Sequence, residues 1–428
     1  MLTRLISAIR QRVSNASVRM VSPKAVTSFS RLLSRGEAKT APSGVDVKGA
    51  RSIVVVRSDG IGDLVLMSPF LRELRRSNPS AWITLVVDGK FRNLVELCPH
   101  VNEVLGFDLN YRGRTIVPAL VLRAWRLSRR LLRARRFDLA LVPRWDVDLY
   151  HSAYLAYFSG ASSRVAYSEN VHPGKQLSNR DFDNLLTRAI DDRTCKHELE
   201  RNLDFLREEG GKVEDDRLEV WLSEEDRETA RRALSSRGVA ANELMIGIGL
   251  SAGHTKRLWP LERFVELGNL LKREFEARFI ITGGSEDRVR GLTFQEELGN
   301  AAINLAGDFT LRQTAALLER TQLVITNDSG PMHLAAAAGA AVIEISCHPK
   351  GGDALHANSP ARFHPWCKDY VVLQPERSLE PCTGFCEWHE AHCILGVSVE
   401  MVQEAARTLM EDRRQVYKAA PGAGKSGA

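Results

Sequence analysis

Residues 323–338 have the pattern of a buried strand that runs directly into a helix, and this pattern strongly restricts the possible folds. Leu323–Thr326 is apolar or β-branched, and an Ala-rich run follows Pro331. Between them, Asp328 and Ser329 suit the cap of a helix, and Pro331 suits its first position because a proline has no N–H to leave unpaired. The stretch therefore predicts a strand, a tight turn and a helix.

The same order recurs along the chain and predicts an α/β protein. Ser52–Val56 is apolar and leads through the turn Arg57–Asp63 into a helical stretch. Short apolar runs alternate with helical patterns in both halves, which indicates two Rossmann-like domains with parallel sheets that face an interdomain cleft. Between Ser159 and Glu219 the sequence loses apolar periodicity and becomes charged, and Glu198–Glu209 is the one clear helix expected there. The further expected strands are 81–87, 104–107, 139–143, 244–250, 278–282, 303–305 and 341–346.

Composition and charge divide the chain further. We expect a tail and linker at 1–50, a first domain at 51–235, a second domain at 236–415 and a disordered tail at 416–428. Met1–Arg35 contains seven Arg or Lys residues and no acid, which suits a transit peptide, an amphipathic segment on an anionic membrane, or a disordered tail. With 44% hydrophobic residues and no run of about 18 apolar residues, the chain is expected to be a cytoplasmic protein without a membrane span.

The helix expected at 117–136 contains seven arginines and no acid. Arginine binds phosphate and carboxylate through two hydrogen bonds, so Arg123, Arg126 and Arg130 are candidates for binding an anionic acceptor or a lipid headgroup. A solvated helix face is the alternative. Nucleic acid is not an expected partner, because neither an aromatic stacking ladder nor a helix-turn-helix or zinc-finger pattern is found.

The turns after the strands should lie at one edge of each sheet, where ligands of such sheets bind. In the second half, a cation such as Lys256 or Arg257 could neutralise a diphosphate, and the helix that starts near Ser329 could bind it through N–H groups. A capped helix with a buried histidine is the simpler alternative. Gly247, Gly249 and Gly253 miss the dinucleotide spacing by one residue, so a nicotinamide oxidoreductase is disfavoured. The candidate residues for binding a nucleoside diphosphate are Lys256, Arg257, Gly283, Gly284, Glu286, Asp328, Ser329, Gly330 and His333.

Several of these stretches, taken in order, resemble glycosyltransferase family 9, the heptosyltransferases of lipopolysaccharide core assembly. The resemblance covers about Ser52 to about Met410. In one departure from the family pattern, Arg257 stands two positions before the tryptophan and Lys256 one further back, which leaves open which of them grips the diphosphate. The segment 348–366 is longer than in many core heptosyltransferases, which leaves the sugar and the base open. The stretches are Arg57–Asp63 with Ser68 and Pro69, Lys256–Phe264, Thr282–Gly284, Leu305–Gly307 and Asn327–Ala335.

The resemblance implies a GT-B fold, with the acceptor bound by the domain at 51–235 and a nucleotide sugar by the domain at 236–415. It also implies an inverting transfer without a metal or other cofactor. It matches Asp63 to the general base, with Gly60 and Gly62 beside it at the acceptor, and it matches Asp328, Ser329, Gly330 and His333 to contacts with the donor phosphates. The implied donor is a nucleotide-diphosphate sugar such as ADP-heptose, and the acceptor is a lipid-linked saccharide at the inner face of the cytoplasmic membrane. The alternatives are transfer to a protein or another glycan, nucleotide-sugar binding without transfer, and a nucleotide-sugar hydrolase or epimerase. Asp63 could instead simply cap its helix.

Five of the seven cysteines lie in the last quarter of the chain, which argues against a disulfide framework. The residue types there suit zinc or iron, but Cys-x₃-Cys with Cys-x₆-Cys is not a standard zinc spacing. We therefore expect no metal, with reduced thiols and surface histidines, and keep a structural metal as the alternative. The residues concerned are Cys367, Cys382, Cys386, His389, His392 and Cys393.

Overall fold

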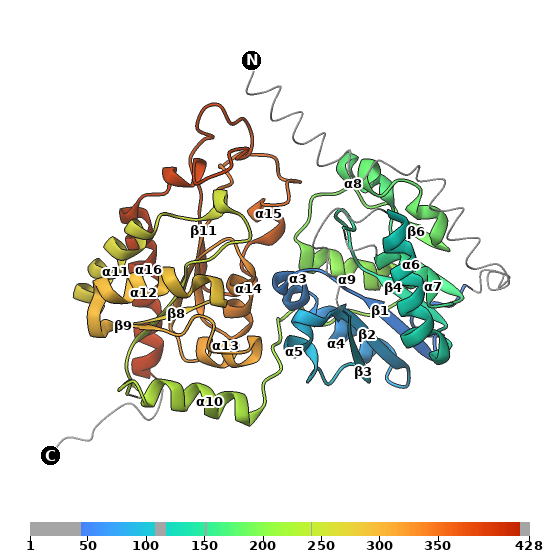
Figure 1. Ribbon diagram of the computed structural model, residues 1–428, viewed down its shortest axis with the longest axis horizontal. Helices are drawn as coiled ribbons and strands as arrows, with labels where there is room; N and C mark the ends of the chain where they lie inside the picture. The colour runs from blue at the N-terminus through green and yellow to red at the C-terminus, as the bar shows by residue number, and fades with distance from the viewer. Residues whose placement is uncertain (1–43, 108–116, 150–151, 241, 420–428) are drawn as a thin grey trace. The chain divides into compact units, whose positions relative to one another are not determined.

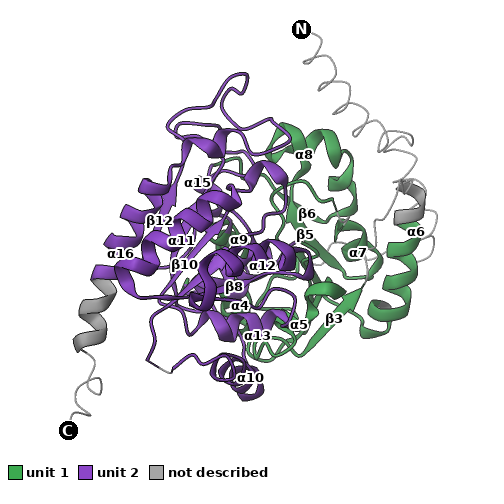
Figure 2. Cartoon of the chain, turned by 60° about the vertical axis from the view of Figure 1, so that its left-hand side comes forward, with its two compact units in different colours: residues 1–59, 69–194, 199–216 green, residues 60–68, 195–198, 217–428 purple. Residues whose placement is uncertain are grey.

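A computed structural model describes residues 44–107, 117–149, 152–240 and 242–419 (Figure 1). The expected basic segment Met1–Arg35 and most of the expected tail at 416–428 lie outside these residues. The chain forms two compact units (Figure 2). The first contains the chain up to Asp59 together with Pro69–Thr194 and Leu199–Asp216, and the second contains Gly60–Ser68, Cys195–Glu198 and the chain from Arg217 onward.

The first unit is built on a six-stranded parallel sheet in the order β3-β2-β1-β4-β5-β6. Side chains of β1 and β4 pack with α6 and α7 into a core that includes Val54, Val121 and Ala140. The strands are β1 (Ser52–Val56), β2 (Trp82–Asp88), β3 (Glu103–Phe107), β4 (Leu139–Val142), β5 (Ser163–Tyr167) and β6 (Arg188–Ile190). The helices that begin in this unit are α5 (Arg92–Val95), α6 (Val117–Leu127), α7 (Ser152–Phe158) and α8 (Pro173–Ser178).

Two helices cross the boundary between the units in sequence. They are α4 (Ser68–Ser77) and α9 (Glu198–Glu208).

Two strands that the sequence pattern did not reveal lie between Ser159 and Glu219. Strands β5 and β6 fall in this stretch and pair with each other in parallel. They escape a search for apolar runs because β5 includes a serine and an arginine and β6 is only three residues long.

The arginine-rich helix is also less regular than expected. α6 ends at Leu127, and the chain continues as a π-helical turn, Ser128–Leu132, and a short 3-10 turn. A π turn holds more residues than an α turn. Here Ser128 and Leu132 are both buried, while Arg129 and Arg130 remain exposed.

The second unit repeats the plan with a six-stranded parallel sheet in the order β12-β11-β10-β7-β8-β9. Counted from its own first strand, this is the same order as in the first unit, and it reverses direction between β7 and β10. Ligands of such sheets bind beyond the strand ends at this reversal. The strands are β7 (Met245–Gly249), β8 (Arg278–Thr282), β9 (Ala302–Asn304), β10 (Leu323–Asn327), β11 (Ala341–Ile345) and β12 (Tyr370–Leu373).

Helices cover both faces of the second sheet. Ile281 packs into the core with Phe264 and Phe294, whereas its neighbour Ile280 packs with Leu234 and Leu317. Adjacent residues of a strand point to opposite faces, so each face has its own core. The helices of this unit are α3 (Ile61–Leu66), α10 (Glu224–Ser235), α11 (Leu261–Phe275), α12 (Arg288–Leu298), α13 (Leu311–Leu318), α14 (Gly330–Ala337), α15 (Pro360–Phe363) and α16 (Val399–Ala419). In the described part of the chain, no helix has the length and apolar character needed to cross a bilayer.

Candidate active site

The turn between β10 and α14 is built as the sequence predicts. Ser329 is the residue before the helix and has extended backbone angles, and Pro331 lies in the first turn. The Ser329 side chain makes no capping hydrogen bond to the helix and lies 3.4 Å from the Thr326 hydroxyl. A helix end with N–H groups that its own cap leaves unpaired favours an anion.

The loop 251–260 is fastened to this turn through Asn327, the last residue of β10. The side-chain oxygen Oδ1 of Asn327 accepts a hydrogen bond from the Trp259 backbone N–H at 2.9 Å. The side-chain nitrogen Nδ2 of Asn327 donates to the Ser251 backbone carbonyl at 3.3 Å. Trp259 is fully buried and donates from Nε1 to the Val397 carbonyl at 2.9 Å. The loops after β7 and β10 are thereby held together at the reversal of the sheet.

Arg257 and Lys256 point to different partners. The Arg257 guanidinium lies 3.2 Å from a carboxylate oxygen of Asp328, next to the start of α14. Lys256 Nζ donates instead to the Cys386 carbonyl at 2.8 Å. Of the two cations, Arg257 is therefore the one beside the candidate phosphate-binding turn.

A second buried acid lies behind Asp328, and sequence reasoning missed it. Burial raises the pKa of Asp328 and Arg257 opposes this shift. Glu344 on β11 is also buried, and burial together with the Asp328 charge raises its pKa well above the usual range. The charges of Asp328, Glu344 and Arg257 thus influence one another. Glu344 stands in an otherwise apolar strand, AVIEI, and that interruption was the available signal.

The turns after β8 and β9 contact each other through their glycines. Gly307 N–H donates to the Gly283 carbonyl at 3.0 Å, and Asp287 accepts a hydrogen bond from Gly284 N–H at 2.9 Å. Glu286 is exposed, and its carboxylate folds so close to Gly284 that a side chain there would collide with it. Asp287, which the sequence analysis also missed, therefore caps this turn, and Glu286 keeps its carboxylate at the surface.

His333 lies one turn into α14 and is buried, and its Nδ1 has no hydrogen-bond partner among the described residues. Burial lowers its pKa to about 4, against an opposing effect of Asp63. α3 belongs to the same unit, and a Cβ on Gly62 would lie 2.5 Å from Cδ2 of the His333 ring. The absence of a side chain at Gly62 is thus required for α3 to approach His333.

Asp63 has the capping contact that the simpler interpretation expects. Its carboxylate accepts a hydrogen bond from Gly60 N–H at 3.3 Å, at the start of α3. A carboxylate offers about four lone-pair sites and this hydrogen bond uses one, so capping does not exclude a second role.

The remaining candidates, Arg123, Arg126 and Arg130, belong to the first unit, as does Asp59 in the turn after β1. Asp59 is buried, and its carboxylate oxygens form ion pairs with the Arg57 guanidinium at 2.6 Å and the Arg144 guanidinium at 2.8 Å. These ion pairs give Asp59 a structural role in that unit. Arg123 and Arg126 on α6 and Arg130 on the following turn are exposed.

Solved structures with the same architecture define the class of fold. A family 9 glycosyl transferase from Veillonella parvula is 24% identical, with a TM-score of 0.69 and coverage of 86% of this chain and 98% of that one. The Escherichia coli ADP-heptose lipopolysaccharide heptosyltransferase II is 20% identical, with a TM-score of 0.63 and coverage of 85% and 99%. The fold is therefore GT-B, with two Rossmann-like domains.

Sequence comparison then gives the family. The model for "Glycosyltransferase family 9 (heptosyltransferase)" matches residues 124–384, and this chain belongs to that family. Lipopolysaccharide heptosyltransferase 2 of Escherichia coli strain K12 is 26% identical over 300 residues, covering 67% of this chain and 79% of that protein. Lipooligosaccharide heptosyltransferase 2 of Haemophilus ducreyi is 22% identical over 343 residues, covering 75% and 88%. The resemblance drawn from the sequence is confirmed.

Proposed function

We propose that this glycosyltransferase moves a heptose or a related sugar from a nucleotide-diphosphate donor to a hydroxyl group of a lipopolysaccharide core or another lipid-linked saccharide. The donor we propose is ADP-heptose. Support comes from membership of family 9 and from a similar structure, an Escherichia coli heptosyltransferase with ADP, which is 16% identical with a TM-score of 0.61. The observation that carries the proposal is the group of loops joined around the turn Asn327–His333.

The donor diphosphate is proposed to bind at the start of α14. Backbone N–H groups near Ser329 and Gly330 would donate to it, and Arg257 would supply the positive charge. Arg257 is chosen over Lys256 because it lies beside Asp328, whereas Lys256 is bonded to the Cys386 carbonyl. His333 is neutral at pH 7 and could donate one hydrogen bond. Glu286 and the turn Gly283–Gly284 would contact the nucleoside.

The chemical step is proposed as a single displacement with inversion and no catalytic metal. The Asp63 carboxylate takes the proton of the acceptor hydroxyl while that oxygen forms a bond to the anomeric carbon. The bond from that carbon to the diphosphate oxygen breaks, and the departing charge is stabilised by Arg257 and the helix N–H groups. Gly60 and Gly62 are proposed to lie beside the acceptor through their backbone, while the missing side chain of Gly62 lets α3 approach His333.

The arginine-rich surface is proposed to contact the acceptor at the inner face of the cytoplasmic membrane. Arg123, Arg126 and Arg130 are exposed, as binding to phosphate groups of a saccharide or lipid requires.

A thermal-shift panel of nucleotide sugars tests the proposed donor. A ligand at a hundred times its Kd stabilises the native state by about 2.7 kcal/mol, so ADP-heptose should raise the melting temperature more than ADP-glucose, UDP-glucose or NAD. A larger shift with another nucleotide sugar would identify that compound, and not ADP-heptose, as the donor. A shift with NAD alone would contradict the proposal as a whole.

A further inference from the structure

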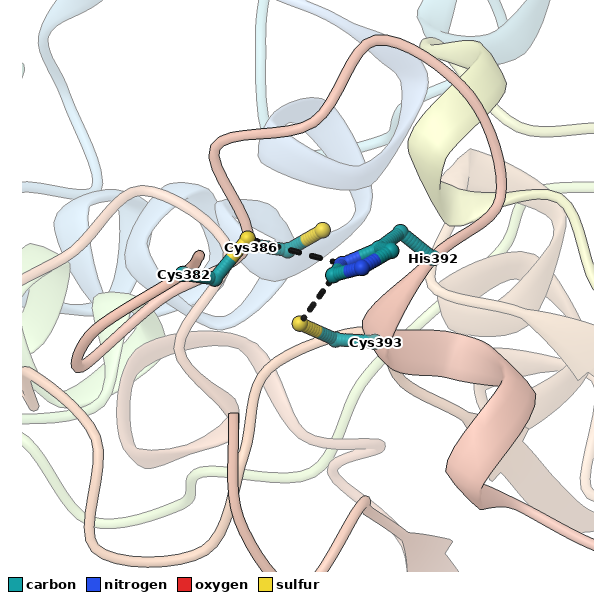
Figure 3. Close-up of side chains that lie close together, drawn as sticks. All are labelled: Cys382, Cys386, His392 and Cys393. Carbon is teal, nitrogen blue, oxygen red and sulfur yellow. Dashed lines mark hydrogen bonds between the residues drawn. The ribbon is translucent and has the colours of Figure 1, made fainter. Parts of the chain in front are cut away.

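A loop between β12 and α16 gathers three cysteines and a histidine around one point (Figure 3). The ligand atoms of Cys382, Cys386, His392 and Cys393 all lie within 4.8 Å of one another. The three cysteines are buried and His392 is half-buried. The other two residues that the sequence grouped with them, Cys367 and His389, are not part of this set.

Two distances within the cluster match those of a tetrahedral ion. His392 Nδ1 lies 3.5 Å from Cys382 Sγ and 3.5 Å from Cys393 Sγ. Zinc binds sulfur at about 2.3 Å and imidazole nitrogen at about 2.0–2.1 Å, so the edge of the tetrahedron between a sulfur and a nitrogen is about 3.5 Å. The observed contacts therefore have the length that a shared zinc ion produces.

Hydrogen bonding between neutral groups accounts for these contacts less well. An imidazole nitrogen carries either one proton or one lone pair, so Nδ1 can form a linear hydrogen bond with one of the two sulfurs but not with both. The Glu387 backbone N–H also points to Cys382 Sγ at 3.4 Å. Such donors stabilise a thiolate, which is the form that binds a metal.

The same loop supports the donor-binding loop of the proposed site. Lys256 Nζ donates to the Cys386 carbonyl, and the Thr255 hydroxyl donates to the His389 carbonyl. From Gln374 to Ser398 the chain forms one short 3-10 turn, Cys393–Gly396, and is otherwise irregular. A bound ion would fix this irregular segment and, through it, the residues next to Arg257.

We propose that Cys382, Cys386, His392 and Cys393 bind one zinc ion with a structural role. Three thiolates and one imidazole complete the four positions of a tetrahedral site, which leaves none for a substrate. The ion therefore takes no part in sugar transfer, and the site is independent of the proposed function. The spacing of the ligands in the sequence is unusual for zinc and argued against a metal. The four ligand atoms nevertheless lie close together, with His392 and Cys393 adjacent in sequence.

Metal analysis of the full-length protein, purified without chelators, tests the proposal. We expect about one zinc ion per chain in the wild type and less than about a tenth of that in Cys386→Ser and His392→Asn. His389→Asn and Cys367→Ser are matched controls, since they change the same residue types nearby and should retain the zinc. Wild-type protein with less than about a tenth of an equivalent of zinc, or zinc retained in His392→Asn, would overturn the proposal.

Cobalt substitution provides a measurement that does not depend on how well the variants fold. Wild-type protein refilled with Co²⁺ should show the intense visible bands of a tetrahedral ion and the near-ultraviolet bands of thiolate ligation. The spectrum of a six-coordinate, oxygen-ligated ion would contradict the site. So would a disulfide between two of the three cysteines in freshly prepared protein, detected as a mass lower by two hydrogens. Stoichiometric iron in place of zinc would overturn the choice of ion.

Discussion

At the scale of single residues, the site depends on a positive charge that is placed against two buried acids. Arg257 pairs with Asp328, and Glu344 lies behind them. A cation that is bonded only to exposed acids would be free to turn away, whereas this one is held beside the start of α14. Its role in donor binding can be separated from that of Lys256 by matched substitutions.

Arg257→Gln should weaken donor binding by about ten- to a hundred-fold, because a charge-assisted hydrogen bond contributes about 1.5–3 kcal/mol. Lys256→Gln should change donor affinity less, because Lys256 is bonded to the Cys386 carbonyl. Isothermal titration of both variants with ADP-heptose gives the comparison. A larger loss in Lys256→Gln would reverse the assignment.

His333 makes stability depend on pH in a defined window. Its pKa in the native state is about 4, below the ordinary value of 6.5. As the pH falls from 6.5 to 4 the unfolded histidine takes up a proton that the native one does not, so the free energy of unfolding decreases. The loss from this group should approach about 3 kcal/mol at and below pH 4.

Urea unfolding of wild type and His333→Gln at several pH values measures this effect. The wild type should lose more stability than the variant between pH 6.5 and pH 4, while the two should change in parallel between pH 7 and pH 8. Comparing the two proteins removes the contributions of the other titrating groups. Identical pH profiles would contradict the buried, neutral state of His333.

At the scale of elements, glycines decide how closely the strand-end turns approach. Gly307 has a φ of 80°, and a Cβ there would lie 2.7 Å from the Ser285 backbone. Gly339 has a similar φ of 86° but open space around it. Gly339→Ala should cost about 1–2 kcal/mol of unfolding free energy from its backbone conformation alone, and Gly307→Ala should cost more.

Donor affinity should also differ between Gly307→Ala and Gly339→Ala. Gly307→Ala displaces the turn that carries Gly283 and Gly284, so nucleotide binding should weaken, whereas Gly339→Ala should bind as the wild type does. Equal stability and equal affinity in the two variants would show that the close contact at Gly307 is not needed.

The arrangement of the elements explains which features of the fold and the site could be predicted from the sequence. The turn from β10 into α14 follows from local chemistry, since the apolar strand, the cap residue and the proline lie within ten positions of each other. β5 and β6 were missed because they are short and partly polar. The electrostatic interaction of Glu344 with Asp328 could not be predicted, because it depends on the pairing of β10 with β11.

The convergence of the candidate metal ligands could not be predicted for a related reason. The spacing rule for metal ligands recognises ligands that repeat at regular intervals on a short turn, but here an irregular loop folds back so that Cys382 approaches His392. Ligand types were visible in the sequence, whereas their convergence depends on the fold.

At the scale of the whole molecule, two sheets of the same strand order carry different parts of the proposed reaction. The turn after β1 leads to Gly60 and Asp63, and the turns after β7 to β10 carry the residues proposed to bind the donor. Each set of turns includes one that lies where the strand order of its sheet reverses. Ligands of such sheets bind at this position. Membership of family 9 identifies the chain as a glycosyltransferase.

The most direct test of this account is sugar transfer by Asp63→Asn, measured with ADP-heptose and a heptose-deficient lipopolysaccharide acceptor, beside a titration of donor binding. Asparagine retains the carbonyl oxygen that accepts the Gly60 N–H but cannot take the acceptor proton. We predict that kcat falls by about a hundred- to ten-thousand-fold while the donor Kd stays within about threefold of the wild type. Transfer by Asp63→Asn at close to the wild-type rate would contradict the assignment of Asp63 as the base.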